Sequence, residues 1–374
     1  MKIIEFNNTT HNEWDEYVNK IPESTFLHTS WMLDYLNAIN GKEKSKSFLI
    51  LDNNDPIAVC PLSIHKTNNF GKEYTEASFG DTPCAYPAIT NIAATQRRRM
   101  VRKIFETIEL ILRPYSIQRI EFYRHPVNLN FLNRNSDFSN NAEALSFGYL
   151  AYIKNTIIID LRDKEHQLFY EMSQYQRKHI RKSEKQGLIV KEYRGDILEL
   201  DKIFEDFKLA HFKSAGRLTR PIESWDLMRD LIKRNQATLF VASVSDGKDI
   251  SYLYCGEFDK FCFGWSQVNI DEYERKYSPR HFLEWKAMVS YKKRGFYYYE
   301  LGIKYDSPQI NYIPTEKEKT ISDFKERYGG KLYPCFYFEK FFNKDLFTMI
   351  YRDKLASFLA SDYFSNSHKT DLHK

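Results

Sequence analysis

The chain of 374 residues lacks the sequence features of membrane and secreted proteins. No run approaches the roughly 18 apolar residues of a membrane-spanning helix. The first residues, MKIIEFNNTTHNEWDEY, contain no apolar core of signal-peptide length. Cysteine is scarce, with five scattered residues and no C-x-x-C pair, so we expect reduced, mostly buried thiols in a cytoplasmic protein and no zinc site.

Several catalytic motifs are missing as well. The sequence has no G-x-S-x-G nucleophile elbow, no P-loop, and no G-x-G-x-x-G after a predicted strand. Its ten histidines do not fall at metal-ligand spacing. These absences disfavour α/β-hydrolases, nucleotide hydrolases, dinucleotide-dependent enzymes and metalloenzymes.

The composition is that of a globular protein with more than one core. Hydrophobic residues make up 42% and aromatic residues 16%, with Phe (28) and Tyr (26) far above Trp (5). The length favours two domains over one. The formal charge of +5 allows an anionic substrate such as a nucleotide sugar, but a solvated surface with a slight lysine excess explains it equally well.

The predicted elements form two halves of similar order. Residues 1–150 predict helices, a strand hairpin, a helix and a strand, and residues 151–340 repeat that order, which suggests a duplicated α/β fold. A final helical segment, 341–374, follows. We see no sequence repeat at fixed spacing.

The most informative stretch spans residues 296–334. An aromatic strand, Phe296–Tyr299, precedes a polar loop, and a short helical segment, Ile321–Arg327, ends before two glycines and a second aromatic strand. Lys325, beside Phe324, lies where these parts meet. We interpret its ammonium as facing an acyl-transfer site, against the alternative of a solvated lysine on a helical turn. Glu300 could serve as a general base, orient Lys325 or form a salt bridge, and these alternatives stay open.

The second half resembles the Fem-type peptidoglycan-bridge transferases and related GNAT-fold acyltransferases of cell-envelope biosynthesis. The similar segments are RKHIRKSEKQGLIV, ATLFVASVSDGKDISYLY, SPRHFLEWKAMVSYKKRGFYYYELG and ISDFKERYGG, and TFLHTSWMLDYL is similar to the family's opening helix. The resemblance implies tandem GNAT-like domains with mixed, mostly antiparallel sheets, the final helix packing on the first domain. It further implies that Lys325 stabilises the tetrahedral intermediate and that Phe324 positions the reacting groups.

The chain departs from the family in features that bear on its substrates. The loop Arg275–His281, the counterpart of the coenzyme-A loop, has no glycine, although the following helix N-terminus could still hold a phosphate. Residues 197–234 are too short for the helical arm of tRNA-using members, and no lysine matches the family's phosphate-binding lysine near Ser30. We expect no bound cofactor, and acyl-CoA or aminoacyl-tRNA as co-substrate, with a slight preference for the thioester.

Further candidate residues are assigned by chemistry and position. Arg217, Arg220 and His211 suit an anionic substrate group, with surface charge as the alternative. Trp265 and Gln267 end a strand where GNAT folds bind the donor, with core packing as an equally good alternative. Asp81 and Tyr86 lie where the family's first domain approaches the acceptor. For donor phosphate we name Arg177, Arg181, Lys276 and Arg280, the first two sharing a helix face that could equally be an ordinary charged face.

The sequence therefore predicts an N-acyltransferase or aminoacyltransferase acting on an amino group of an envelope or polysaccharide precursor. The acceptor is a small molecule or a nucleotide- or lipid-linked amino sugar or peptide. The alternative is a catalytically silent protein that binds such a precursor. A tRNA donor, peripheral membrane contact and the oligomeric state stay open, and no DNA partner is expected.

Overall fold

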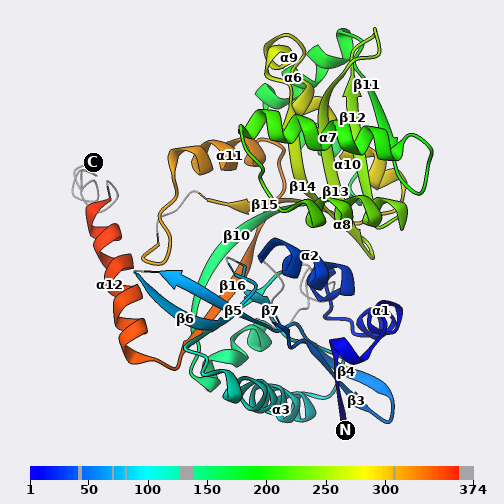
Figure 1. Ribbon diagram of the computed structural model, residues 1–374. Helices are drawn as coiled ribbons and strands as arrows, with labels where there is room; N and C mark the ends of the chain where they lie inside the picture. The colour runs from blue at the N-terminus through cyan, green and yellow to red at the C-terminus, as the bar shows by residue number, and fades with distance from the viewer. Residues whose placement is uncertain (41–43, 70, 81, 127–137, 306–308, 362–374) are drawn as a thin grey trace. The chain divides into compact units, whose positions relative to one another are not determined.

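The computed structural model describes residues 1–40, 44–69, 71–80, 82–126, 138–305 and 309–361 (Figure 1). It divides into two compact units. The first holds Met1–Asn155, Tyr305–Ser322 and Pro334–Lys374, and the second holds Thr156–Lys304 and Asp323–Tyr333. The division predicted from the sequence kept residues 151–340 together, whereas residues 151–155, 305–322 and 334–340 belong to the first unit here.

The first unit contains two groups of strands. One sheet has the order β1-β3-β4-β8, and the other strands follow the order β10-β16-β9-β6-β5-β2, with β7 beside β9. The strands are β1 (Lys2–Glu5), β2 (Lys44–Ser45), β3 (Phe48–Asp52), β4 (Asp55–Cys60), β5 (Ser63–Asn69), β6 (Lys72–Ala77), β7 (Cys84–Ala85), β8 (Ala88–Ile89), β9 (Arg119–Arg124), β10 (Leu150–Asp160) and β16 (Lys331–Phe341). The last two strands, β10 and β16, cross the division, so each unit contains part of both.

The helices of the first unit are α1 (His11–Lys20), α2 (Ser30–Asn40), α3 (Ala94–Leu112) and α12 (Lys344–Ala360), and α11 (Glu316–Glu326) begins there. Short 3₁₀ segments cover Phe6–Asn8, Phe26–His28, Arg113–Tyr115 and Phe138–Phe147. Local chemistry sets the ends. Thr10 and Glu13 form a reciprocal capping box on α1, and the Asn343 side chain accepts a hydrogen bond from the Leu346 amide at the start of α12.

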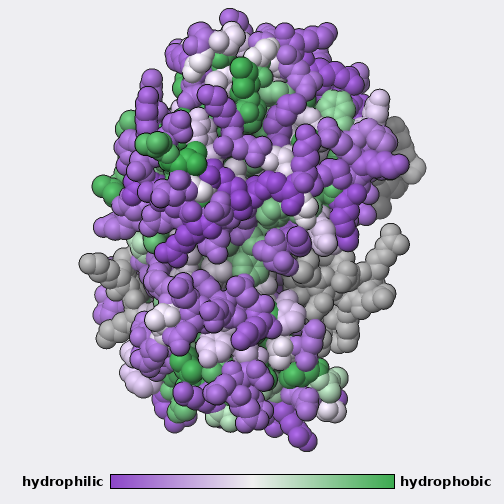
Figure 2. Space-filling model, turned by 90° about the vertical axis from the view of Figure 1, so that its right-hand side faces the viewer, coloured by the Kyte–Doolittle hydropathy of each residue, from purple (hydrophilic) through white to green (hydrophobic). Residues whose placement is uncertain are grey.

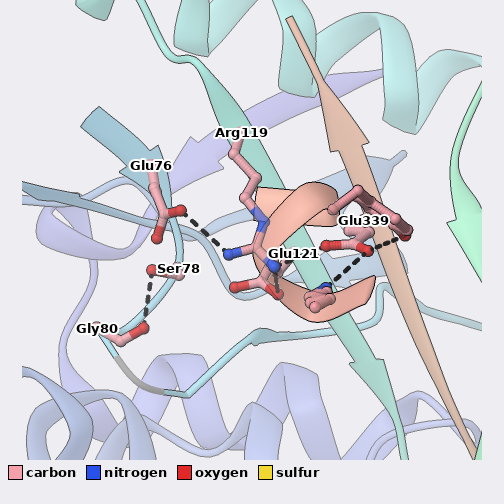
Figure 3. A network of polar contacts seen from close by, with 8 residues as sticks. Glu76, Ser78, Gly80, Arg119, Glu121 and Glu339 are labelled. Atoms are coloured by element: carbon pink, nitrogen blue, oxygen red, sulfur yellow. Dashed lines mark hydrogen bonds and ion pairs between the residues drawn. The ribbon is translucent and has the colours of Figure 1, made fainter. Parts of the chain in front are cut away.

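A buried polar cluster joins three strands of the first unit (Figure 3). The Arg119 guanidinium, on β9, donates to Glu76 of β6 at 3.2 Å, to Glu121 of β9 at 2.5 Å and to Glu339 of β16 at 2.6 Å. Three carboxylates thus surround one cation. We call these four residues the Arg119 cluster.

Helix α12 attaches to the same cluster. Its Tyr351 hydroxyl donates to Glu339 at 2.5 Å, and the Lys354 ammonium lies 3.4 Å from that carboxylate. Its apolar side packs on Tyr74 of β6 through Leu346 and Ile350. Lys354 therefore adds a second cation to a site with three carboxylates.

The second unit is a sheet with helices on both faces. Its strands follow the order β11-β12-β13-β14-β15-β10-β16. The new elements are β11 (Ile189–Tyr193), β12 (Ala237–Ser243), β13 (Asp249–Phe258), β14 (Phe261–Asn269), β15 (Tyr298–Lys304), α5 (Glu165–Glu171), α6 (Gln174–Lys185), α7 (Leu200–Ala215), α8 (Ile222–Lys233), α9 (Asp271–Tyr277) and α10 (Pro279–Lys293). Because successive strand residues face opposite sides, Tyr254 of β13 reaches Met228 of α8, whereas Cys255 reaches Tyr299 on the face that α10 covers.

Most of the surface in one view is hydrophilic, and the hydrophobic residues on that face stand in small separate groups (Figure 2). Within the described part of the chain, no helix is both long enough and apolar enough to cross a membrane. The described residues also contain no group of three or more His, Cys, Asp or Glu that could hold a metal ion. All five cysteines are buried and free.

Candidate active site

Strands β14 and β15 of the second unit separate after a short stretch of pairing. They are parallel, and the described register contains the pairs Phe261–Tyr298, Cys262–Tyr299 and Phe263–Glu300. Both strands continue, β14 to Asn269 and β15 to Lys304. The edge of β14 that faces away from β13 therefore has no described β15 partner beyond Phe263, and its backbone can pair with an extended ligand.

A β-bulge lies next to this separation. The register between β13 and β14 passes from Tyr254–Ser266 to Cys255–Gly264, so Trp265 is an extra residue. A bulge re-aims the side chains on either side of it, and bulges are common beside active sites. Here it directs Ser266 to one face of the sheet and leaves Gly264 directed to the other.

Lys325 of α11 lies at the β15 side of the separation. Its ammonium donates to the Ile303 carbonyl at 3.2 Å, and among the described residues this is its one hydrogen-bond acceptor. A Cβ on Gly302 would lie 2.9 Å from the Lys325 Nζ, so the absent side chain at Gly302, where φ is +94°, makes room for the ammonium. The lysine is half-buried.

Two buried carboxylates influence the charge of Lys325. Burial lowers the pKa of Lys325, while the negative charges of Glu300 and then Glu284 raise it. Glu300 accepts a hydrogen bond of 2.5 Å from Thr156 of β10. The carboxylates therefore help the lysine to remain protonated in a desolvated position.

Glu284 of α10 is the more strongly perturbed group. Burial raises its pKa to about 7, against the Tyr299 hydrogen bond and the positive charges of Lys325 and Arg280. The Tyr299 hydroxyl donates to Glu284 at 2.7 Å. A Cβ on Gly264 would lie 3.2 Å from that hydroxyl and 3.4 Å from the carboxylate, so this glycine accommodates the pair.

Two further predicted residues join this group. The Arg280 guanidinium lies 5.2 Å from the centre of the Phe324 ring, and the Gln267 side chain donates to the Arg280 carbonyl at 3.5 Å. Arg280 stands in the first turn of α10, which begins at Pro279 after Ser278 in a left-handed conformation. The structure thus brings Lys325, Phe324, Gln267 and Arg280 together in the second unit.

A second predicted group lies on the other face of the same strand. His211 of α7 is 2.9 Å from the Ser266 hydroxyl, and Arg220 donates to that hydroxyl at 3.4 Å. The Arg220 guanidinium also lies 4.7 Å from the Trp225 ring centre. Burial, followed by the charge of Arg220, lowers the pKa of His211 to about 4, so this imidazole is neutral at pH 7.

The remaining predicted residues are not part of either group. Arg177 donates to the carbonyls of Tyr170 and Met172, at the end of α5, and Arg181 lies 5.2 Å from the Phe169 ring centre. The sequence predicts one helix over residues 165–185, but Ser173 caps a new helix, α6. The Arg177 hydrogen bonds to the end of α5 stabilise the turn between the two helices. Both arginines therefore pack on α5, which favours the charged-face alternative over a phosphate site.

The last four candidates are dispersed. Lys276 is exposed and lies 4.7 Å from the ring centre of its neighbour Tyr277, and Arg217 is exposed with no contact to either group in the described structure. Tyr86 is buried in the first unit beneath Arg124, whose guanidinium lies 5.0 Å from its ring centre. Asp81 lies outside the described residues.

Sequence reasoning missed Glu284, Ser266 and the two glycines that make room for charged groups. Glu284 had a usable signal, because it is a lone carboxylate inside the apolar run HFLEWKAMV, where a charged residue requires a partner. The roles of Gly264 and Gly302 depend on contacts across strands and had no local signal.

The comparisons with known proteins identify the class of the second unit. Residues 173–312 match the family model described as "Acetyltransferase (GNAT) domain". These residues are therefore similar to a GNAT acetyltransferase domain. No curated protein matches the sequence closely enough to count as a relative. The family match covers β14, β15 and α10, which supply the Glu284 pair and one side of the Lys325 site.

Solved structures extend the similarity beyond the GNAT domain. FemX shares 14% identity at a TM-score of 0.69, over 94% of this chain and 100% of its own. L-PGS from Bacillus licheniformis shares 11% sequence identity at a TM-score of 0.59, and the match covers 92% of this chain and 95% of that one. The C-terminal domain of a putative lysylphosphatidylglycerol synthetase from Agrobacterium fabrum shares 12% identity at a TM-score of 0.55, over 92% of this chain and 96% of that one. At such identities the similarity shows the fold, and it confirms the predicted Fem-like, GNAT-type α/β fold.

Proposed function

We propose that this protein transfers an acyl or aminoacyl group to an amino group of a cell-envelope or polysaccharide precursor. The observation that carries the proposal is the position of Lys325. Its half-buried ammonium stands beside the end of the β14–β15 pairing and has one hydrogen-bond acceptor among the described residues. The remaining N–H groups are available to an oxygen of a ligand.

The chemistry needs a cation at this position. The acceptor nitrogen attacks the donor carbonyl carbon, and negative charge develops on the carbonyl oxygen. The C–S bond of a thioester, or the C–O bond of an aminoacyl ester, then breaks, and the nitrogen's proton ends on the leaving group. A preorganised hydrogen-bond donor at such an oxygen increases the reaction rate roughly 10²–10³-fold. Lys325 would supply it, with Phe324 holding the reacting groups in place.

The other residues near β14 suit the two substrates. On one face, Arg220 and the neutral His211 converge on Ser266 and can recognise an anionic or polar part of the acceptor. Arg217, Tyr86 and Asp81 remain predicted substrate-binding residues, and Trp265 remains a prediction for the stretch where the donor pairs with the strand. On the other face, Arg280 and the first turn of α10 are suited to donor phosphate, with Lys276 as a predicted addition.

The length of two helices bears on the donor. Helices α7 and α8 have 16 and 12 residues and fill the segment in which tRNA-using members carry a helical arm. This favours acyl-CoA over aminoacyl-tRNA. The name of the A. fabrum relative, a putative lysylphosphatidylglycerol synthetase, points to aminoacyl transfer, so both donors belong in the test.

The test is a mass-shift assay of candidate amino sugars and envelope precursors with acetyl-CoA, longer acyl-CoA and aminoacyl-tRNA. We expect one pair to yield an amide, and Lys325→Ala to reduce the yield per unit time about 10²–10³-fold. Precursor binding without turnover by the wild type, across all donors, would contradict the proposal and favour a silent binding protein.

A further inference from the structure

Helix α3 of the first unit carries a compact group of exposed cations. Arg98, Arg99, Arg102 and Lys103 are all exposed, and their spacing places them on one side of the helix. In the described part of the chain, none of the four forms an ion pair with a carboxylate. We call these four residues the α3 basic face.

Their neighbour Arg97 shows the contrast. It is buried, and its guanidinium donates to Glu23 at 2.6 Å and to Glu143 at 2.9 Å. Glu109, on the next turns of α3, is paired with Lys340 at 2.6 Å, which leaves Glu106 as the other exposed carboxylate of α3. On α3 itself, four cations against this one carboxylate give a local charge of about +3.

A cavity of about 390 Å³ opens beside the basic face. Arg99, Lys103 and Gln96 line one side, and Ile57, Ile92 and Met100 contribute apolar walls. Asp52 and Met1 also line the cavity, and the Asp52 carboxylate lies 3.9 Å from the Met1 amino group. The cavity therefore combines two cations with aliphatic side chains, the arrangement that suits a phosphate joined to a hydrocarbon chain.

We propose that the α3 basic face binds the surface of an anionic lipid membrane, with a phospholipid phosphate at Arg99 and Lys103 and the start of its hydrocarbon in the cavity. Charge complementarity supports the membrane as occupant, because unpaired cations gain most from a surface of many phosphates. RNA would call for aromatic side chains on which bases stack, and the cavity walls are aliphatic. The proposal concerns attachment and does not depend on the transfer reaction.

The test uses the full chain and vesicles of phosphatidylcholine with or without phosphatidylglycerol, separated by flotation. We expect binding to the anionic vesicles at about 0.1 M salt and its loss at about 1 M, where the Debye length falls from about 10 Å to about 3 Å. The variant Arg98→Gln, Arg99→Gln, Arg102→Gln and Lys103→Gln combined should bind roughly 600-fold more weakly, since each of the four cations contributes about fivefold.

A matched control removes four exposed lysines of the second unit, Lys185, Lys191, Lys202 and Lys213, all changed to Gln. It has the same net charge as the first variant and should bind like the wild type. Equal loss in both variants, or equal binding to neutral vesicles, would overturn the proposal. Thermal unfolding of both variants shows whether each is folded.

Two further arms examine the cavity and the choice of occupant. Ile92→Glu places a carboxylate in the apolar wall and should weaken vesicle binding about tenfold, whereas unchanged binding would rule out insertion of the lipid. Bulk tRNA serves as competitor. If it binds more tightly than the anionic vesicles, and the variant in the α3 basic face abolishes that binding, the surface is for nucleic acid and the membrane proposal is wrong.

Discussion

Each unit contains a partly buried cation near buried carboxylates, but the two cations have different partners. In the Arg119 cluster, both terminal nitrogens of the guanidinium donate to carboxylates, at distances from 2.5 to 3.2 Å. In the second unit, Glu284 and Glu300 take their hydrogen bonds from Tyr299 and Thr156, and the Lys325 ammonium donates to a carbonyl.

The difference separates a structural cation from a functional one. Arg119 has its charge neutralised by fixed partners on β6, β9 and β16, so its ion pairs stabilise the association of these strands. Lys325 has carboxylates near enough to influence its pKa, yet the described hydrogen bond of its ammonium goes to the Ile303 carbonyl, and this leaves N–H groups for a ligand. Arginine suits the first task through its fork of donors, and lysine suits the second as a compact point charge.

The largest expected effect is the loss of stability when Arg119 is removed. Arg119→Ala leaves three carboxylates in a buried site with Lys354 as the nearest cation, and breaking such a pair costs about 3–5 kcal/mol. Urea unfolding should show this loss in the free energy of unfolding. The control Arg113→Ala, at an exposed position of the same unit, should change it by less than about 0.5 kcal/mol. Similar losses in both variants would mean that the Arg119 cluster makes no specific contribution to the stability of the fold.

Lys325→Ala should show the opposite pattern. We expect the transfer rate to fall about 10²–10³-fold, because the developing oxyanion loses its cation, while the free energy of unfolding stays within about 1 kcal/mol of the wild type. The control Lys317→Ala, exposed on the same helix, should leave both quantities unchanged. A large loss of stability with Lys325→Ala would make this lysine a second structural cation.

The excess of carboxylates in the Arg119 cluster predicts a pH dependence. Burial raises the pKa of Glu121 from its usual 4.5 to about 7, so folding favours the protonated form. The stability from this group is complete below about pH 4.5 and is lost as the pH rises to about 7. Glu121→Gln should therefore increase the free energy of unfolding by about 1–3 kcal/mol at pH 8, and the gain should shrink towards pH 5. A variant less stable than the wild type at pH 8 would show that the Arg119 pair outweighs the burial.

Gly302→Ala tests whether the backbone makes room for the ammonium. The residue has φ of +94°, and its Cβ would lie 2.9 Å from the Lys325 Nζ. We expect a loss of about 1–2 kcal/mol in stability from the left-handed backbone, and a roughly tenfold slower transfer because the ammonium moves. Gly187→Ala is the matched control, since Gly187 has φ of +72° and open space around it. Equal transfer rates in the two variants would remove the role assigned to Gly302.

The sequence predicted much of the fold but little of the site's geometry. The second aromatic strand, predicted from Leu332, appears as β16, and the predicted helix Arg280–Arg294 appears as α10, because strand and helix patterns are local. The first aromatic strand was predicted at Phe296–Tyr299, but β15 begins at Tyr298 and runs through Gly302 to Lys304. A glycine after an aromatic run is typical of a strand end, but Gly302 lies inside β15. It makes room there for a lysine 23 residues further along the chain, and this contact is visible only in three dimensions.

For the site residues too, local patterns are visible in the sequence and contacts between distant residues are not. Lys325 and Phe324 are assigned through a family motif. Arg177 and Arg181 share a helix face, which says nothing about what lies opposite, and in the structure both pack on α5. Ser173 caps α6 and so interrupts the predicted long helix, but a single serine between Met172 and Gln174 is a weak signal for a break. Glu284 and Tyr299 meet across 15 residues of sequence, a pairing that no local pattern encodes.

The smallest expected effect concerns Glu284, a carboxylate that influences the pKa of Lys325 without a described hydrogen bond to it. Glu284 raises the pKa of Lys325 by its charge, so Glu284→Gln should move the alkaline fall of the transfer rate to lower pH. The control Glu326→Gln, at an exposed neighbour of the lysine paired with Lys304, should leave that limb in place. If the limb does not move in Glu284→Gln, then Glu284 serves Tyr299 alone, and Glu300 by itself keeps the ammonium charged.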